Sequence, residues 1–164
     1  MNPKIRARGL FILIGIFLIG MFYLLSWGTG WRDLSRQYAA RDRYQGEWIT
    51  QPNLDGTLRS GPYVLLNGSE SDNAIEVGAD RQGLYLSMPM EYRLFHPPLF
   101  IPWSDVSCIR VRAAPWTGEN LVRFTFAKSP SIPLDVEVPV AMEIQGRSEG
   151  RWTIPEGAPG FPAR

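Results

Sequence analysis

The chain begins with one continuous apolar run over residues 9–28 and then changes to short alternating segments. The run reads GLFILIGIFLIGMFYLLSWG and contains no charged residue. A helix that crosses a bilayer needs about 20 apolar residues, because each adds about 1.5 Å and the backbone must satisfy its own hydrogen bonds. The pattern predicts a transmembrane helix over residues 9–28, preceded by a basic tail over residues 1–8. Tyr23, Trp27 and Trp31 suit the interfacial belt at its end.

A cleaved signal peptide is the alternative interpretation of this run. Lys4, Arg6 and Arg8 form a basic start, and Ser26-Trp27-Gly28 loosely resembles a cleavage site. The apolar part of a signal peptide usually spans about 7 to 15 residues, and the longer run here favours an anchor. The basic residues before the run lie closest to it, whereas arginines also follow it. The positive-inside rule therefore favours, without deciding, a domain on the periplasmic side of a bacterial inner membrane.

Residues 29–45 are predicted to form an amphipathic connector. Leu34 and Tyr38 fall on one helical stripe, with charged residues around them. Such a helix can lie on a bilayer, where arginines meet lipid phosphates, or pack its stripe against the following domain, and both interpretations stay open. The candidate membrane-surface contacts are the arginines of this segment: Arg32, Arg36, Arg41 and Arg43.

From residue 46 the period becomes alternating, which predicts a β domain over residues 46–147. Its clearest unit is an antiparallel hairpin with strands at residues 74–79 and 83–88, joined by a turn that ends at Gly83, where a positive φ would set a bulge. Asn67-Gly68 marks a second tight turn. Three prolines between residues 95 and 103 predict an edge strand there. The other expected strands lie at residues 47–50, 63–66, 106–112, 121–127 and 132–138.

Three further features complete the expected domain. A change of phase near Cys108 predicts either a bulge or the start of a strand there. Pairing of the last two strands would bring Arg123 close to the solvent-facing Asp135 and Glu137. Residues 139–146 have the proline and glycine of a short helix, and residues 148–164 are expected to be a flexible tail. The predicted fold class is mainly β: one N-terminal transmembrane helix plus a small antiparallel barrel or sandwich with a short C-terminal helix.

Length and charge narrow the function classes. A chain of 164 residues has room for one such domain. Its 17 basic and 16 acidic residues give a net charge of +1, which provides no strong field for nucleic acid. The single cysteine, Cys108, excludes an internal disulfide and a multi-cysteine metal site within one chain. We expect no nucleic-acid partner.

No catalytic, metal or cofactor site is predicted. His96 is the only histidine, and an enzyme would have to use it with Asp105 or Cys108, although HPP is better interpreted as a structural turn. Residues 69–73 could hold calcium, but solvation explains their acids better. Trp103 and Trp116 flank a loop-rich region and, with His96, are the candidates for a binding groove; a core or lid role is the alternative.

One segment resembles a known family. GLYL over residues 83–86, followed by HPPLFIPWSDV over residues 96–106, resembles the middle hairpin of bacterial pleckstrin-homology-like (PH-like) and GRAM-like domains. It is also similar to short bacterial proteins of unknown function with one N-terminal membrane helix. The likeness covers residues 74–112. It implies a PH-like fold and, by analogy of fold alone, binding to lipid headgroups or protein partners, with no site residue to carry over.

The expected function is therefore a membrane-anchored, non-catalytic binding or scaffold module in the bacterial inner membrane. The expected partners are the lipid bilayer and another membrane or envelope protein. A membrane-surface lipid-binding protein, or an enzyme that uses His96, is the alternative.

Overall fold

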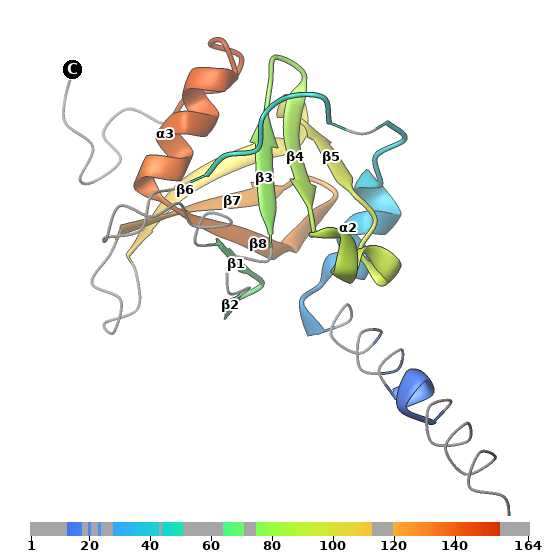
Figure 1. Ribbon diagram of the computed structural model, residues 1–164. Helices are drawn as coiled ribbons and strands as arrows, with labels where there is room; N and C mark the ends of the chain where they lie inside the picture. The colour runs from blue at the N-terminus through green and yellow to red at the C-terminus, as the bar shows by residue number, and fades with distance from the viewer. Residues whose placement is uncertain are drawn as a thin grey trace, which may run out of the picture.

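The computed structural model is mainly β, with two antiparallel sheets that enclose one hydrophobic core (Figure 1). The structure describes residues 13–17, 20, 23, 28–42, 44–50, 64–70, 75–112 and 120–154. The larger sheet has the strand order β2-β1-β8-β7-β6 and the smaller sheet has the order β3-β4-β5. The strands are β1 (Val64–Leu66), β2 (Ser69–Glu70), β3 (Glu76–Ala79), β4 (Gly83–Ser87), β5 (Leu99–Pro102), β6 (Val106–Arg112), β7 (Asn120–Phe126) and β8 (Ser129–Glu137).

Helices α2 and α3, whose full bounds lie within the described residues, and two short 3-10 helices accompany the sheets. Helix α2 (Trp31–Tyr38) contacts β5 and β8, and helix α3 (Val138–Arg147) contacts β3, β7 and β8. The 3-10 helices η1 (Met90–Phe95) and η2 (Trp103–Asp105) precede β5 and β6. In Figure 1 the two α-helices lie at opposite ends of the sheets.

The expected transmembrane helix over residues 9–28 is overturned. Among the residues that the structure describes, no helix combines the length and the apolar character that a bilayer span requires. The described residues of that run are 13–17, 20, 23 and 28. Helix α3, which is longer than α2, has 10 residues. A span needs about 20. The fold class is therefore corrected to mainly β without that helix.

Helix α2 packs its apolar stripe on the β domain. Trp31, Leu34 and Tyr38 are all buried, which is the second of the two arrangements left open by the sequence. The Trp31 indole N–H donates to the Pro97 carbonyl at 3.0 Å, and the Tyr38 hydroxyl accepts from the Lys128 amide at 2.9 Å. Trp31, expected in an interfacial belt, is instead a core residue.

The β3–β4 hairpin is confirmed, with Val77 opposite Leu86 and Ala79 opposite Leu84. Gly83 does not adopt the positive φ that the sequence analysis expected, so another constraint accounts for a glycine at this position. A Cβ there would collide with the backbone carbonyl oxygen of Ile101 on β5. Gly83 therefore permits the close approach of two strands.

The β1–β2 hairpin has the turn that its sequence predicts. Asn67 and Gly68 have φ values of 53° and 75°, and two positive φ values are typical of a type I′ turn. In the larger sheet the expected bulge at Cys108 is absent from the β6–β7 pairing. The register shift instead lies between Phe124 and Phe126, where β7 pairs with β8.

The last two strands bring Arg123 and Asp135 together, as expected. Arg123 donates Nε to Oδ1 at 2.7 Å and Nη2 to Oδ2 at 2.8 Å. The Asp135 side chain is only 5% exposed, so the prediction that it faces solvent is wrong. A bidentate, largely buried Arg–Asp ion pair stabilises the fold more than an exposed ion pair does.

The segment after α3 belongs to the folded domain as far as the structure describes it. Trp152 is buried, with its ring 5.1 Å from that of Phe124 and 5.8 Å from that of Trp103. The Ser148 hydroxyl, also buried, donates to the Trp152 carbonyl at 2.9 Å. The expected flexible tail therefore does not include residues 148–154, and residues 155–164 lie outside the described part.

Candidate functional site

One segment crosses the outer face of the smaller sheet from edge to edge. We call residues 39–49 the strap; Arg43 within it is outside the described residues. At the β5 edge Ala39 bridges Leu99 and the Ala40 amide donates to the Pro98 carbonyl at 2.8 Å. At the β3 edge the Ile49 amide donates to the Val77 carbonyl at 2.8 Å. Figure 1 shows the strap passing over β3, β4 and β5.

Tyr44 fixes the middle of the strap to the sheet. Its ring lies 4.5 Å from that of Tyr85 on β4, and its hydroxyl donates to the Ala79 carbonyl at 2.9 Å. Beneath the ring is Gly78, where a Cβ would stand 2.5 Å from Tyr44 Cε1. Trp48 packs edge-on against Tyr44 at 4.9 Å. The absence of a side chain on Gly78 thus leaves the space that the Tyr44 ring occupies; we call this space the Tyr44 seat.

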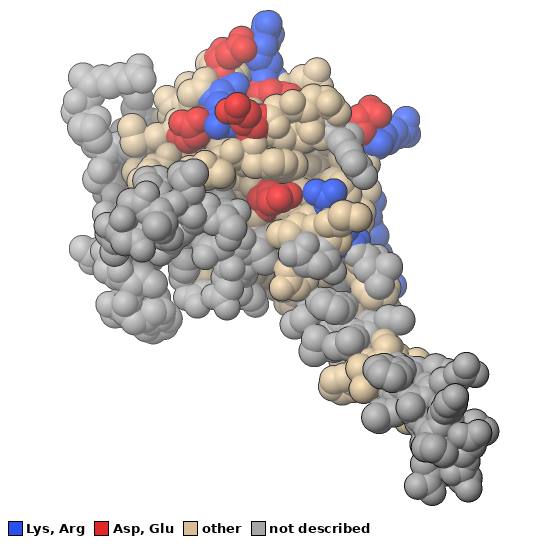
Figure 2. All heavy atoms as spheres, viewed as in Figure 1, with Lys and Arg blue, Asp and Glu red and all other residues tan. Residues whose placement is uncertain are grey.

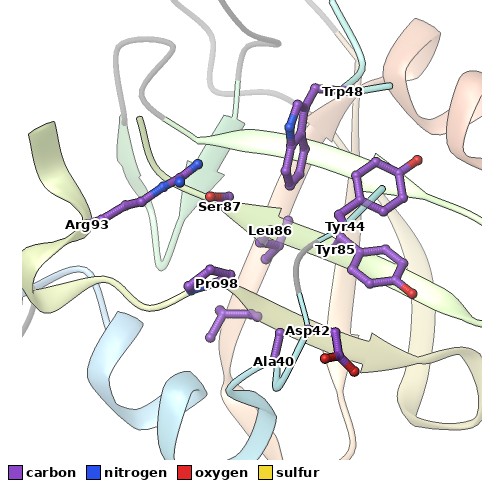
Figure 3. Close-up of a pocket in the computed structure, with 10 residues that line it drawn as sticks. Ala40, Asp42, Tyr44, Trp48, Tyr85, Leu86, Ser87, Arg93 and Pro98 are labelled. Atoms are coloured by element: carbon purple, nitrogen blue, oxygen red, sulfur yellow. The ribbon is translucent and has the colours of Figure 1, made fainter. Parts of the chain in front are cut away.

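A pocket of about 140 Å³ opens between the strap, the sheet and η1 (Figure 3). One wall is aromatic, from Tyr44, Trp48 and Tyr85, and the buried Ser87 lies in the floor. Arg93 of η1 reaches in from the opposite side, with its guanidinium directed towards Ser87 (Figure 3). The remaining lining residues are Ala40, Asp42, Leu86, Pro98 and Leu99.

The two charged residues that line the pocket differ in their partners. Arg93 donates Nε to the Met88 carbonyl at 2.8 Å, and its Nη2 lies 3.6 Å from Glu76 Oε2. Asp42 is exposed, and no described residue forms an ion pair or hydrogen bond with it. Figure 2, which faces this side, shows acidic and basic side chains interspersed. Arg93 thus has an acidic partner in Glu76, whereas Asp42 has no charged partner within the described part of the chain.

The Tyr85 phenol in the aromatic wall stays uncharged at neutral pH. Burial, together with the negative charge of Asp80 and a hydrogen bond with it, raises the pKa of Tyr85 to about 12. The phenol therefore presents a neutral ring.

Two of the three groove residues that the sequence suggested lie elsewhere in the fold, and neither lines the pocket. His96 is buried, with Nδ1 2.8 Å from the Tyr92 carbonyl oxygen and its ring 5.6 Å from that of Trp31. Burial lowers the pKa of His96. Trp103 donates its indole N–H to the Asp80 carbonyl at 2.8 Å and stacks on Trp152. Trp116 lies outside the described residues.

The partners proposed for a His96 enzyme are engaged in other contacts. Lys128 Nζ lies 3.1 Å from Asp105 Oδ2. Cys108 is half-buried, and burial raises the pKa of its thiol to about 11, which leaves it protonated at neutral pH. Within the described part of the chain, no cluster of three or more His, Cys, Asp or Glu side chains could hold a metal ion. Residues 69–73, for which calcium binding was the weaker alternative to simple solvation, lie mostly outside that part, because residues 71–73 are not described.

The arginines expected at a membrane surface have different environments. Arg32 donates to the Tyr23 hydroxyl at 2.7 Å, and Arg36 pairs with Asp33 at 3.2 Å. Arg41 is exposed, and Arg43 is not described. A role for them at a lipid surface stays a prediction.

The residues that define the pocket were missed by the sequence analysis. One signal was present: Tyr85 falls between Leu84 and Leu86, so it must face away from the core that those leucines enter. An aromatic residue on the outer face of a strand needs a cover, and the cover is Tyr44. Arg93 carried no comparable signal, because only the fold brings η1 beside the strap.

No protein-family model, curated protein or solved structure matches this chain. The resemblance of residues 74–112 to PH-like and GRAM-like domains therefore stays a prediction, and the pocket is the guide to function.

Proposed function

We propose that the β domain is a non-catalytic binding module and that the pocket beneath the strap is its ligand site. The observation that carries the proposal is the combination of an aromatic wall, a buried hydroxyl and two charged groups around one concave space. Ligand sites commonly pair apolar and aromatic walls with a few placed polar groups. A volume of about 140 Å³ suits a small molecule or a single side chain of a partner.

Pre-organisation of the wall supports the same proposal. Tyr44 is held by a hydrogen bond to Ala79 and by its seat on Gly78. Arg93 is oriented by its bond to the Met88 carbonyl. A ligand that meets groups already in place loses less free energy to ordering them.

The proposal is tested by a fragment screen on the 15N-labelled full chain, with backbone amide and indole N–H signals followed by NMR. We expect saturable shifts centred on the indole of Trp48 and the amides of Tyr44, Tyr85 and Ser87. The indole of Trp103, which does not line the pocket, serves as the internal reference. A screen without hits, or hits that shift other regions and leave Trp48 unmoved, would contradict the proposal.

A blocking variant sharpens the test. In Figure 3 the Ala40 side chain points towards Leu86, so Ala40→Leu should fill part of the pocket and abolish the shifts. Ala39→Leu changes the neighbouring residue, which is exposed and does not line the pocket, and should leave binding unchanged. Equal binding by both variants would place the ligand elsewhere.

A further inference from the structure

We infer that Arg147, the last residue of α3, is a positioning residue of the pocket. It holds the part of the strap that carries two aromatic residues of the wall, Tyr44 and Trp48, through a hydrogen bond to the backbone between them. The inference rests on the proposed function, since it treats the pocket as a ligand site. It adds a residue that does not line the pocket but fixes its wall from outside.

The first step is the bond itself. Arg147 donates Nη1 to the backbone carbonyl oxygen of Glu47, across 100 residues of sequence. Glu47 directly precedes Trp48, and the chain bends at Gly46 just before it. The Tyr44 hydroxyl lies 3.4 Å from the same carbonyl oxygen. A hydrogen bond from a charged donor is stronger than one between neutral groups, so this contact fixes the segment between the two wall residues.

The second step is the support behind the guanidinium. The side chains that seat α3 in the core are fully buried: Val140, Ala141 and Ile144. One turn back along the helix, Glu143 accepts from Arg147 Nε at 2.8 Å. Burial lowers the pKa of Arg147, but hydrogen bonds with Glu143 and Tyr44 outweigh it and raise the pKa. The strap is therefore attached to a core helix by a group that stays charged.

The third step is the dependence of the wall on this segment. Ala40 and Ile49 attach the strap at the two edges of the sheet, and Tyr44 attaches it between them. Trp48 packs edge-on against Tyr44 at 4.9 Å, so a shift of the backbone between these two residues would separate their rings. A ligand that meets rings already in place loses less free energy to ordering them. Arg147 thus sets the affinity of the pocket without touching the ligand.

The alternative is a role for Arg147 within α3 alone. A cation in the last turn of a helix interacts favourably with the helix dipole, and Glu143 and Arg147 form an i, i+4 ion pair. That role requires no contact with the strap, so the bond to the Glu47 carbonyl favours the positioning role. The two roles also differ in what they predict: loss of the arginine loosens either α3 or the strap.

The test is amide hydrogen exchange of the 15N-labelled full chain without any ligand. The Ile49 amide, bonded to the Val77 carbonyl, reports the opening of the strap beside Glu47. Arg147→Gln removes the charged donor, and we expect the Ile49 amide to exchange about tenfold faster than in the natural chain. The amide of Ile144 in α3 should change much less. Equal acceleration of both amides would mean that the arginine stabilises only the helix or the whole fold, and would overturn the inference.

Glu143→Gln is the matched control. It removes the ion pair of α3 but keeps an oxygen that can accept from Arg147 Nε, so the Ile49 amide should exchange at its natural rate. If Ile49 accelerates as much in this variant as in Arg147→Gln, the effect belongs to the helix and the inference is overturned.

Affinity provides the second readout. Fragments that shift the Trp48 indole in the natural chain should bind Arg147→Gln several-fold more weakly, because they must then order the wall themselves, and should bind Glu143→Gln as before. Unchanged affinity in Arg147→Gln would overturn the inference while the binding module stands. A screen without hits would instead remove the proposed function, whereas the exchange rates, which need no ligand, still decide whether Arg147 holds the wall.

Discussion

At the scale of single residues, the pocket depends on a side chain that Gly78 does not have. A Cβ at this position would stand 2.5 Å from Tyr44 Cε1, too close for the ring to stay on Tyr85. We predict that Gly78→Ala displaces Tyr44, lowers the free energy of unfolding by about 1 to 3 kcal/mol and weakens ligand binding, because an inserted methyl overpacks a filled site. Urea denaturation and an NMR titration with a fragment that binds the pocket measure the two effects.

Gly146→Ala is the matched control. Gly146 is an exposed residue of α3, and a Cβ there meets no atom within 4 Å. Alanine in a helix is more stable than glycine by roughly 0.5 to 1 kcal/mol, so this variant should gain stability and keep its affinity. Destabilisation of the same size by both variants would show that the Tyr44 seat is not the cause.

A second residue-scale prediction concerns acid stability. The hydrogen bond from Lys128 lowers the pKa of Asp105 below its ordinary value near 3.8 and outweighs partial burial, which raises it. A carboxyl with a lowered folded-state pKa contributes stability above its unfolded pKa and loses it as the pH falls through the folded one. Lys128→Gln should therefore be less stable than the natural chain at pH 6, and the difference should shrink below about pH 4. Urea midpoints at several pH values measure this.

The control for that prediction is Arg36→Gln, which removes an exposed pair with Asp33. Exposed pairs contribute at most about 1 kcal/mol, so its midpoint should change little. A stability difference for Lys128→Gln that stays constant down to pH 2 would contradict the role given to Asp105.

Residue-scale chemistry was predictable where it depends on neighbours in the sequence. Asn67-Gly68 forms the expected turn, and Asp80 completes another by accepting the Gln82 and Gly83 amides at 2.7 and 3.2 Å. The steric constraint that requires a glycine at position 83 was not predictable, because the carbonyl that excludes a side chain belongs to Ile101 on a different strand. Contacts across elements carry no local signal.

At the scale of elements, the end of α3 shows how a tail with little sequence pattern becomes part of the core. The Ser148 hydroxyl lies within hydrogen-bond distance of the carbonyl oxygens of Gln145 and Trp152, at 2.7 and 2.9 Å, where the chain bends back towards the sheets. Trp152 then lies between Trp103 of η2 and Phe124 of β7. The segment lacks periodicity, so the sequence indicated a flexible tail, although one buried aromatic residue is enough to fix it.

We predict that Trp152→Ala lowers the free energy of unfolding by about 3 to 5 kcal/mol, because it removes a large buried ring and leaves a cavity. Arg151→Ala changes an exposed neighbour and should shift stability by less than about 0.5 kcal/mol. Thermal and urea denaturation of both variants measure the difference. A small effect of Trp152→Ala would mean that residues after α3 do not contribute to the core.

The strap is the element that the sequence analysis did not find. The sequence analysis assigned residues 29–45 to an amphipathic connector and predicted a strand at residues 47–50, but that strand does not form. The described residues of the strap instead contact the sheet through the bridge at Ala39, the backbone hydrogen bonds of Ala40 and Ile49 and the side chain of Tyr44. Helix α2 was found, because Leu34 and Tyr38 repeat at helical spacing. The sequence left open which surface that stripe covers, and the buried Trp31 shows that it is the domain.

At the scale of the whole molecule, α2, both sheets, α3 and Trp152 contribute to one hydrophobic cluster. A single shared core unfolds as one cooperative unit. With 5-fluorotryptophan in the full chain, we predict that the NMR signals of Trp31 and Trp152 disappear at the same urea concentration. These residues lie in α2 and after α3, near opposite ends of the sheets, so separate midpoints would show that one end opens independently.

The strap also covers backbone at both edges of the small sheet. It contacts β5 through the bridge between Ala39 and Leu99, and β3 through the hydrogen bond from the Ile49 amide to the Val77 carbonyl. Open strand edges recruit further strands into aggregates. We therefore expect that shortening the strap to enlarge the pocket would expose these edges to other chains, whereas remodelling the η1 side around Arg93 would leave the contacts of the strap in place.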